Sequence, residues 1–99
     1  MIRHVVLLEW NEKVTDAAVQ AVTDSLASLP DQIAEIRSYQ FGPDRGLNDR
    51  NADYALIADF NSEADFSTYV SHPAHVDLMK NLTGPILASF RSAQFVLPE

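Results

Sequence analysis

Three histidines and one tyrosine are the side chains of this sequence best suited to proton transfer near neutral pH. His72 and His75 follow closely behind Tyr69, and His4 lies near the N-terminus. An imidazole can accept a proton and a phenol can donate a hydrogen bond, so a histidine beside a tyrosine forms a base–acid pair. The spacing therefore predicts a site of acid–base chemistry centred on Tyr69 and His75.

The residues around these histidines indicate how they are presented. Pro73 is well suited to begin a helix, which would place His75 in the first helical turn. The positive end of the helix dipole disfavours imidazolium there, so we expect a neutral His75 that can accept a proton. A structural interpretation is also open. A His-Pro pair between two helices often forms a turn with a capping side chain, and a tyrosine three residues after Phe66 is often part of a core.

Other kinds of chemistry find little support in the residue types present. The sequence contains no cysteine, which removes disulfides, thiolate nucleophiles and cysteine-ligated metals. His72 and His75 would share one helix face only without a break between them, and Pro73 argues against that. The three glycines are isolated, so there is no phosphate-binding loop. We therefore predict no metal site and no cofactor.

The composition places these residues in one small acidic domain. The chain has 99 residues, a formal net charge of −7 and a hydrophobic fraction of 46%, which is typical of a single globular domain over residues 1–99. Only seven Lys and Arg stand against fourteen Asp and Glu, which disfavours nucleic acids and anionic membranes. No apolar run approaches the roughly 20 residues of a membrane span. We expect a cytoplasmic protein that binds neither nucleic acid nor a membrane.

Two hydrophobic periodicities alternate along the chain. Helical spacing of apolar residues predicts a helix over 15–29, capped by Thr15 and ended by Pro30, and shorter helices after Ser62 and Pro73. A period of two predicts strands over 2–10, 34–41, 54–60 and 89–97. This βαββαβ order is the ferredoxin-like α+β arrangement, a four-stranded antiparallel sheet with both helices on one face. The polar stretch 43–53 is predicted to be a loop.

The strands predict a second copy of the chain. Residues 2–10 and 54–60 are apolar on both faces, and the chain has nothing left to cover the face opposite the helices. Packing of sheet against sheet would bury that face, which predicts a homodimer through the open sheet face. We expect a charge at Val6 or Leu8 to unfold or aggregate the protein. The 43–53 loop could also serve as an interaction module for another protein. It offers no apolar anchor except Leu47, so we rank this function below an enzyme or a non-catalytic ligand-binding protein.

Several segments resemble one known family, the stress-responsive A/B barrel (Dabb) proteins. The most specific of them is the run from Tyr69 to Val76, and the resemblance extends over nearly the whole chain. The other matching segments are His4 with the apolar strand Val5–Leu8, the turn Phe41–Gly42, Tyr54 at a strand start, and Asp59–Ser62.

The resemblance implies a dimeric α+β barrel and suggests a cofactor-free enzyme, either of the cyclase/lyase type or an oxygenase of the related dimeric barrels. A plant polyketide cyclase of this family closes an aromatic ring without a cofactor, using a tyrosine and a histidine. Carried over by motif, the catalytic pair would be Tyr69 and His75, with His4 and His72 in substrate-binding positions. The substrate would be an enolisable, hydrophobic or aromatic small molecule. The alternative is a non-catalytic, stress-related protein that binds a small ligand or acts as a structural dimer, and the sequence leaves open whether the protein is an enzyme.

Overall fold

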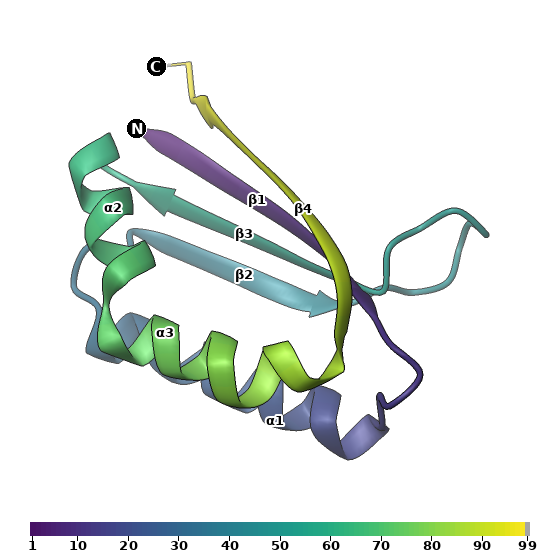
Figure 1. The fold of residues 1–99 in the computed structure, drawn as a ribbon. Coiled ribbons are helices and arrows are strands. Elements are labelled where there is room, and N and C mark those ends of the chain that lie inside the picture. The colour runs from purple at the N-terminus through teal and green to yellow at the C-terminus, as the bar shows by residue number, and fades with distance from the viewer. Residues whose placement is uncertain (99) are drawn as a thin grey trace.

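A computed structural model describes residues 1–98 and shows a four-stranded antiparallel sheet with helices on one face (Figure 1). The strands lie in the order β2-β3-β1-β4. This arrangement confirms the ferredoxin-like α+β fold predicted from the hydrophobic pattern. The elements are β1 (Ile2–Trp10), α1 (Asp16–Gln32), β2 (Ser38–Pro43), β3 (Tyr54–Phe60), α2 (Glu63–Ser71), α3 (Pro73–Leu78), a π-helical turn η1 (Met79–Thr83), a short 3₁₀ turn η2 (Gly84–Ile86) and β4 (Leu87–Val96).

Side-chain caps begin the three α-helices. Thr15, Ser62 and His72 precede α1, α2 and α3, and each side chain accepts a hydrogen bond of 3.1 Å from a backbone N–H of the first turn. These bonds satisfy donors that a helix start otherwise leaves without partners. The predicted caps at Thr15 and Ser62 are confirmed. No helix in the described part of the chain is long and apolar enough to cross a bilayer.

Three predicted elements have different bounds in the structure. The last strand, β4, runs over Leu87–Val96 instead of 89–97, and two further boundaries differ for local reasons. Pro30 does not end α1, which continues to Gln32, because a proline so near a helix end removes only one backbone donor. The Ile33 N–H still bonds to the Leu29 carbonyl at 2.8 Å. The second strand begins at Ser38 rather than at residue 34, because the preceding residues form a turn.

The helical segment after Pro73 is also less regular than predicted. It is α-helical to Leu78 and then widens into the π turn η1 before the break at Gly84. A π turn accommodates an additional residue and rotates the side chains that follow. In α3 itself, before this turn, Leu78 is buried and Val76 is 46% exposed.

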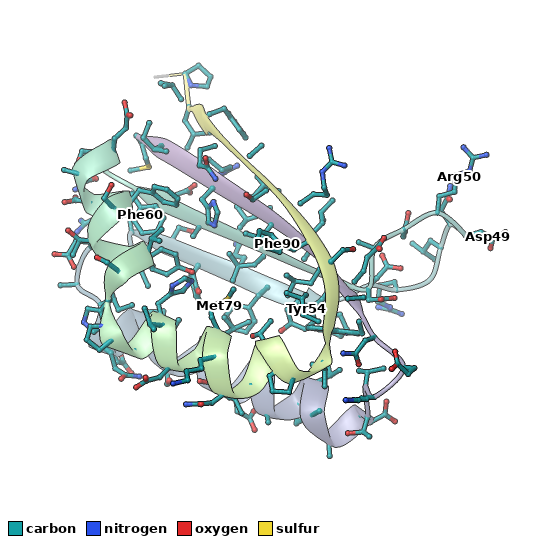
Figure 2. All side chains as sticks on the ribbon, viewed as in Figure 1. Asp49, Arg50, Tyr54, Phe60, Met79 and Phe90 are labelled. Carbon is teal, nitrogen blue, oxygen red and sulfur yellow. The ribbon has the colours of Figure 1, made fainter. Side chains whose placement is uncertain are left out.

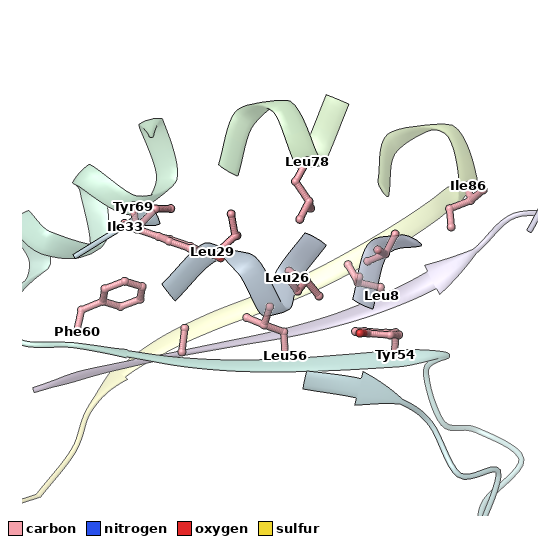
Figure 3. Close-up of a cluster of buried hydrophobic side chains, with 12 residues drawn as sticks. Leu8, Leu26, Leu29, Ile33, Tyr54, Leu56, Phe60, Tyr69, Leu78 and Ile86 are labelled. Atoms are coloured by element: carbon pink, nitrogen blue, oxygen red, sulfur yellow. The ribbon is translucent and has the colours of Figure 1, made fainter. Parts of the chain in front are cut away.

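The hydrophobic core fills the space between the sheet and the helices (Figure 3). Leucines of α1 and α3 pack over the apolar residues of β1 and β3, which alternate toward the helices. Tyr54 and Phe60, at the two ends of β3, mark the length of this layer in Figure 2. The buried apolar residues are Leu8, Val22, Leu26, Leu29, Ile33, Tyr54, Leu56, Ala58, Phe60, Tyr69, Leu78 and Ile86.

The opposite face of the sheet is open and partly apolar. Val5 lies on this face, paired with Ile57 of β3 and Ala93 of β4, and Leu7 is 44% exposed beside it. Val6 and Leu8 instead face the helices, so a charge at either would disrupt the core of one chain and is not a specific test of dimer contacts. The sequence pattern could not show which face the helices cover.

An ion pair lies at one end of this open face and a loop at the other. Arg3 and Asp59 form a two-point ion pair across β1 and β3, with N–O distances of 2.8 and 2.9 Å. This contact holds the pKa of Asp59 below its usual value, chiefly through the hydrogen bonds from Arg3. At the other end the predicted loop extends away from the helices, with Asp49 and Arg50 far from the core (Figure 2).

Candidate functional site

A cavity of about 280 Å³ lies between the sheet and the helices, on the covered side of the sheet. The proton-transfer residues predicted from the sequence therefore lie inside a single chain and not between two packed sheets. The cavity opens beside β4, whose lining residues are exposed while those of α1 and β3 are buried. The lining residues are His4, Val6, Leu8, Val22, Leu26, Leu56, Phe66, Tyr69, Val70, His75, Leu78, Met79, Thr83, Phe90, Ser92 and Gln94.

His4, Tyr69 and His75 meet at one end of this cavity. The ring centroids of Tyr69 and His75 are 4.4 Å apart, and those of His4 and Tyr69 are 6.3 Å apart. The break between α2 and α3 allows this contact, because it turns His75 back toward the helix that carries Tyr69. His4 enters from β1 and packs against Phe66, with ring centroids 4.9 Å apart. Three of the four predicted site residues are thus together.

The hydrogen bond of His75 determines which of its nitrogens can act as a base. Nδ1 lies 3.0 Å from the Val70 carbonyl oxygen. A carbonyl can only accept, so Nδ1 carries the proton and the neutral ring keeps its lone pair on Nε2. Burial lowers the pKa of His75, with a smaller opposing effect from the Val70 bond. Burial therefore favours the neutral form that we expect for His75.

His4 has the opposite arrangement. Its Nδ1 lies 2.9 Å from Nε2 of Gln94 on the adjacent strand. In this amide orientation Gln94 donates, so the His4 proton resides on Nε2. Burial, reinforced by the nearby His75, lowers the pKa of His4 to about 4. The cavity thus contains one neutral imidazole arranged to accept a proton and another arranged to donate a hydrogen bond.

The hydroxyl of Tyr69 is hydrogen-bonded to that of Tyr39, which the sequence did not suggest as a site residue. The hydroxyl oxygens of Tyr39 and Tyr69 are 2.7 Å apart. Burial raises the pKa of both phenols, that of Tyr69 to about 12, and the bond to Tyr39 partly offsets the rise at Tyr69. When Tyr39 donates to Tyr69, the Tyr69 proton is available to a ligand.

His72 is not brought together with the other three residues. Its Nδ1 accepts a hydrogen bond from the Ala74 N–H and so caps α3, and the side chain does not line the cavity. His72 therefore has the structural role considered above for the His-Pro pair, that of a capping side chain in the turn between two helices. Within residues 1–98 no three His, Asp or Glu side chains gather in a way that could hold a metal ion.

The lowered pKa of His4 predicts a pH-dependent stability. Between pH 6.5 and about 4 the unfolded chain takes up a proton that the folded His4 does not, so stability is complete above pH 6.5 and falls toward pH 4. A shift of this size corresponds to at most about 3 kcal/mol. We expect His4→Asn, which keeps an acceptor for Gln94, to flatten this part of the curve. Urea unfolding at fixed protein concentration measures the free energy of unfolding across this pH range. Wild-type and His4→Asn curves of this free energy against pH that run parallel would contradict the prediction.

Sequence reasoning did not identify Tyr39 and Gln94. The sheet pairing, and not strand alternation, shows that each lies on the helix side of its strand, because Tyr39 pairs with Ala58 and Gln94 pairs with His4. The register that places them beside Tyr69 and His4 depends on strands that are distant in the sequence.

The fold and the cavity define a class: a ferredoxin-like α+β domain with an apolar cavity that ends in histidine and tyrosine. The stress responsive A/B barrel domain (Dabb) family matches residues 2–97, and the chain belongs to that family. A curated relative is the stress-response A/B barrel domain-containing protein HS1 of Arabidopsis thaliana, which is 23% identical over 87 residues, or 86% of this chain and 80% of the relative.

Solved structures share this fold. A dimeric ferredoxin-like protein from Thermobifida fusca is similar with a TM-score of 0.90 and 40% identity, over 97% of this chain and 90% of that one. A hydroxynitrile lyase from Passiflora edulis has a TM-score of 0.85 at 18% identity, over 99% of this chain and 94% of that one. At that identity the likeness to the lyase shows a shared fold only.

Proposed function

We propose that the cavity binds an apolar small molecule that carries a carbonyl group, and that His75 and Tyr69 move a proton at the carbon next to that carbonyl. The observation that carries this proposal is the His75 bond to the Val70 carbonyl, which leaves Nε2 as the basic atom in a largely apolar cavity. A neutral imidazole in such surroundings can take a proton from carbon.

The chemistry needs two groups with different tasks. The lone pair on Nε2 of His75 takes the proton from the carbon, and the electrons of the broken C–H bond form the enolate, whose charge resides on oxygen. The Tyr69 hydroxyl donates a hydrogen bond to that oxygen, and the N–H of His4 can provide a second. Return of a proton from His75 restores the carbonyl compound. Attack of the enolate carbon on a second carbonyl would form a C–C bond, and the resulting alkoxide would take the proton held by His75, which is a cyclase reaction. The reverse sequence, which breaks that C–C bond, is a lyase reaction.

Deuterium exchange tests this proposal without knowledge of the natural substrate. Acetophenone has enolisable methyl hydrogens and one carbonyl on an apolar ring. In D₂O at pH 7.5 we expect the protein to accelerate deuterium incorporation into the methyl group, measured by NMR. Tyr69→Phe keeps the ring but removes the hydrogen bond to the enolate, so we expect exchange to slow by about 10²-fold. Exchange at the buffer rate with wild-type protein would contradict the enzymatic proposal.

Binding without turnover is the second candidate, and the same hydrogen bond favours it. A histidine whose Nδ1 is satisfied by a backbone carbonyl can serve as a structural element of a ligand site. In that case acetophenone would shift NMR signals of the lining residues but would not exchange its methyl hydrogens. The two candidates therefore give opposite results in one experiment.

We also propose that the functional unit is a homodimer formed through the open sheet face. Val5, Leu7 and Phe95 lie on that face, and Leu7 and Phe95 are 44% and 48% exposed in the single chain. Apolar groups at such positions favour burial against a matching surface. The protein from Thermobifida fusca is described as dimeric, as is a ferredoxin-like protein from Bacteroides fragilis, which supports this proposal.

A further inference from the structure

A polar group without a protein partner lies at the other end of the cavity. Thr83 lines the cavity and is 1% exposed, and among residues 1–98 its hydroxyl oxygen is the one buried side-chain oxygen or nitrogen that makes no hydrogen bond. A threonine in a helix often bonds to a carbonyl of the preceding turn, and Thr83 does not. A buried hydroxyl without a partner is costly, so its position calls for an explanation.

The π turn η1 places Thr83 at this position. The Gly84 N–H bonds to the Met79 carbonyl oxygen, five residues earlier, and a Cβ at Gly84 would lie 2.8 Å from that oxygen. Gly84 therefore suits the wider turn because it has no side chain. One additional residue in a turn rotates the following side chains by about 100° compared with an α-helix. π turns of this kind are frequent at functional sites.

The distance between the two ends of the cavity can be estimated along two of its walls, and the two estimates agree. Along β1 the wall runs from His4 to Leu8, four residues or about 13 Å. Along the helical side it runs from His75 to Thr83, eight residues or about 12 Å. Thr83 belongs to the far end because η2, which follows it, bonds through the Ile86 carbonyl to the chain just after β1.

The residues between these ends are mainly apolar. They come from β1, β3, α1, α3, η1 and β4 and include Met79 and Phe90, both labelled in Figure 2. Ser92 is a polar residue midway along β4, where it pairs with Val6, and it is exposed at the opening of the cavity. A ligand that reaches from end to end therefore contacts a long apolar wall.

The cavity also has no group to neutralise a charged ligand. Within the described residues, its lining includes no Asp, Glu, Lys or Arg. Burial lowers the pKa of His4 to about 4 and that of His75 below its usual value, which favours the neutral form of both rings at pH 7. A carboxylate or phosphate would have to lose its hydration without gaining a counter-ion, which is strongly unfavourable.

We infer that Thr83 is a second polar anchor, and that the cavity takes an elongated, uncharged ligand with an apolar body and a hydrogen-bonding group at each end. One end would bind at His4, Tyr69 and His75, and the other at Thr83. This inference rests on the proposed function, because it assigns a substrate class to the same cavity. It is tested separately, because Thr83 has no part in the proton transfer.

Three biphenyl compounds of similar length test both parts of the inference. We expect 4,4′-dihydroxybiphenyl to bind the wild-type protein about tenfold more tightly than 4-hydroxybiphenyl, measured by calorimetry at pH 7.5. We expect 4′-hydroxybiphenyl-4-carboxylate, which is anionic at this pH, to bind at least tenfold more weakly than the diol. Thr83→Val keeps the side-chain shape and should remove the advantage of the diol, whereas Thr83→Ser should retain most of it.

Each outcome supports or overturns a definite part of this inference. Thr83→Val should unfold at the same or a higher temperature than wild type, because it removes a hydroxyl without a partner. Equal affinity of wild type for the diol and the mono-ol, or an undiminished diol preference in Thr83→Val, would overturn the anchor. A carboxylate that binds as tightly as the diol would overturn the uncharged class. If no biphenyl binds while acetophenone still exchanges deuterium, the inference fails and the proposed function stands.

Discussion

His75→Asn should slow deuterium exchange into acetophenone by at least 10²-fold while the protein remains folded. The Nδ2 of asparagine can occupy the place of the imidazole Nδ1 and donate to the Val70 carbonyl, so the local turn is kept. The substitution removes Nε2, the atom to which we assign the proton acceptor. Removal of a general base typically costs 10²–10⁴-fold in rate. NMR measurement of the methyl signal in D₂O gives the rate directly.

The same substitution at a neighbouring histidine provides a matched comparison. His72→Asn retains an acceptor for the Ala74 N–H at the start of α3, and asparagine is a favourable cap. It also decides whether His72 has the substrate-binding role that the sequence suggested. We expect its exchange rate to stay within about twofold of wild type, because the side chain does not line the cavity. Exchange at the wild-type rate in His75→Asn would exclude His75 as the base.

Leu7→Asp should raise the dissociation constant of the proposed dimer at least 100-fold. Leu7 is already 44% exposed on the open sheet face, so the fold of one chain loses little when it is replaced. In a two-fold symmetric contact the substitution occurs twice, and each copy loses an apolar contact and brings a carboxylate toward an apolar surface. Burial of one leucine side chain contributes about 2 kcal/mol. Light scattering after size exclusion, over a concentration series, measures the change.

A second leucine serves as the control for this experiment. Leu47 is 88% exposed in the loop between β2 and β3, so Leu47→Asp makes the same chemical change away from the sheet face. We expect Leu47→Asp to behave like wild type. A wild-type protein that is monomeric throughout the concentration series would refute the dimer. Loss of association in Leu47→Asp alone would place the contact at the loop instead of the sheet.

Most of the fold follows from local patterns that the sequence displays directly. Strand alternation located β1 and β3, and Thr15 and Ser62 were recognisable caps. The errors are at places where local preference is weak. Pro30 lies so near a helix end that the helix tolerates it, and the start of β2 depends on its pairing with β3. The π turn before Gly84 produces an apolar spacing that resembles an ordinary helix.

The residues of the candidate site also fall into two groups, those that local sequence could predict and those that it could not. Tyr69 and His75 are six residues apart, and the break at Pro73 could be read from the chain, so their contact was predictable. Tyr39, Gln94 and Thr83 come from distant segments, and nothing in their own neighbourhoods indicates a cavity. Because alternation has a period of two, the sequence also shows two faces of β1 without indicating which one the helices cover.

The sequence alone determined the elements, their order and the residue types available for chemistry, since propensity, capping and hydrophobic period act over a few neighbouring residues. Only the tertiary structure decided that His4 and His75 adopt complementary proton arrangements, because their partners are the Gln94 side chain and the Val70 carbonyl. It also decided that the cavity lies within one chain. Burial shifts the pKa values there, and burial is a property of the packed molecule and not of any segment.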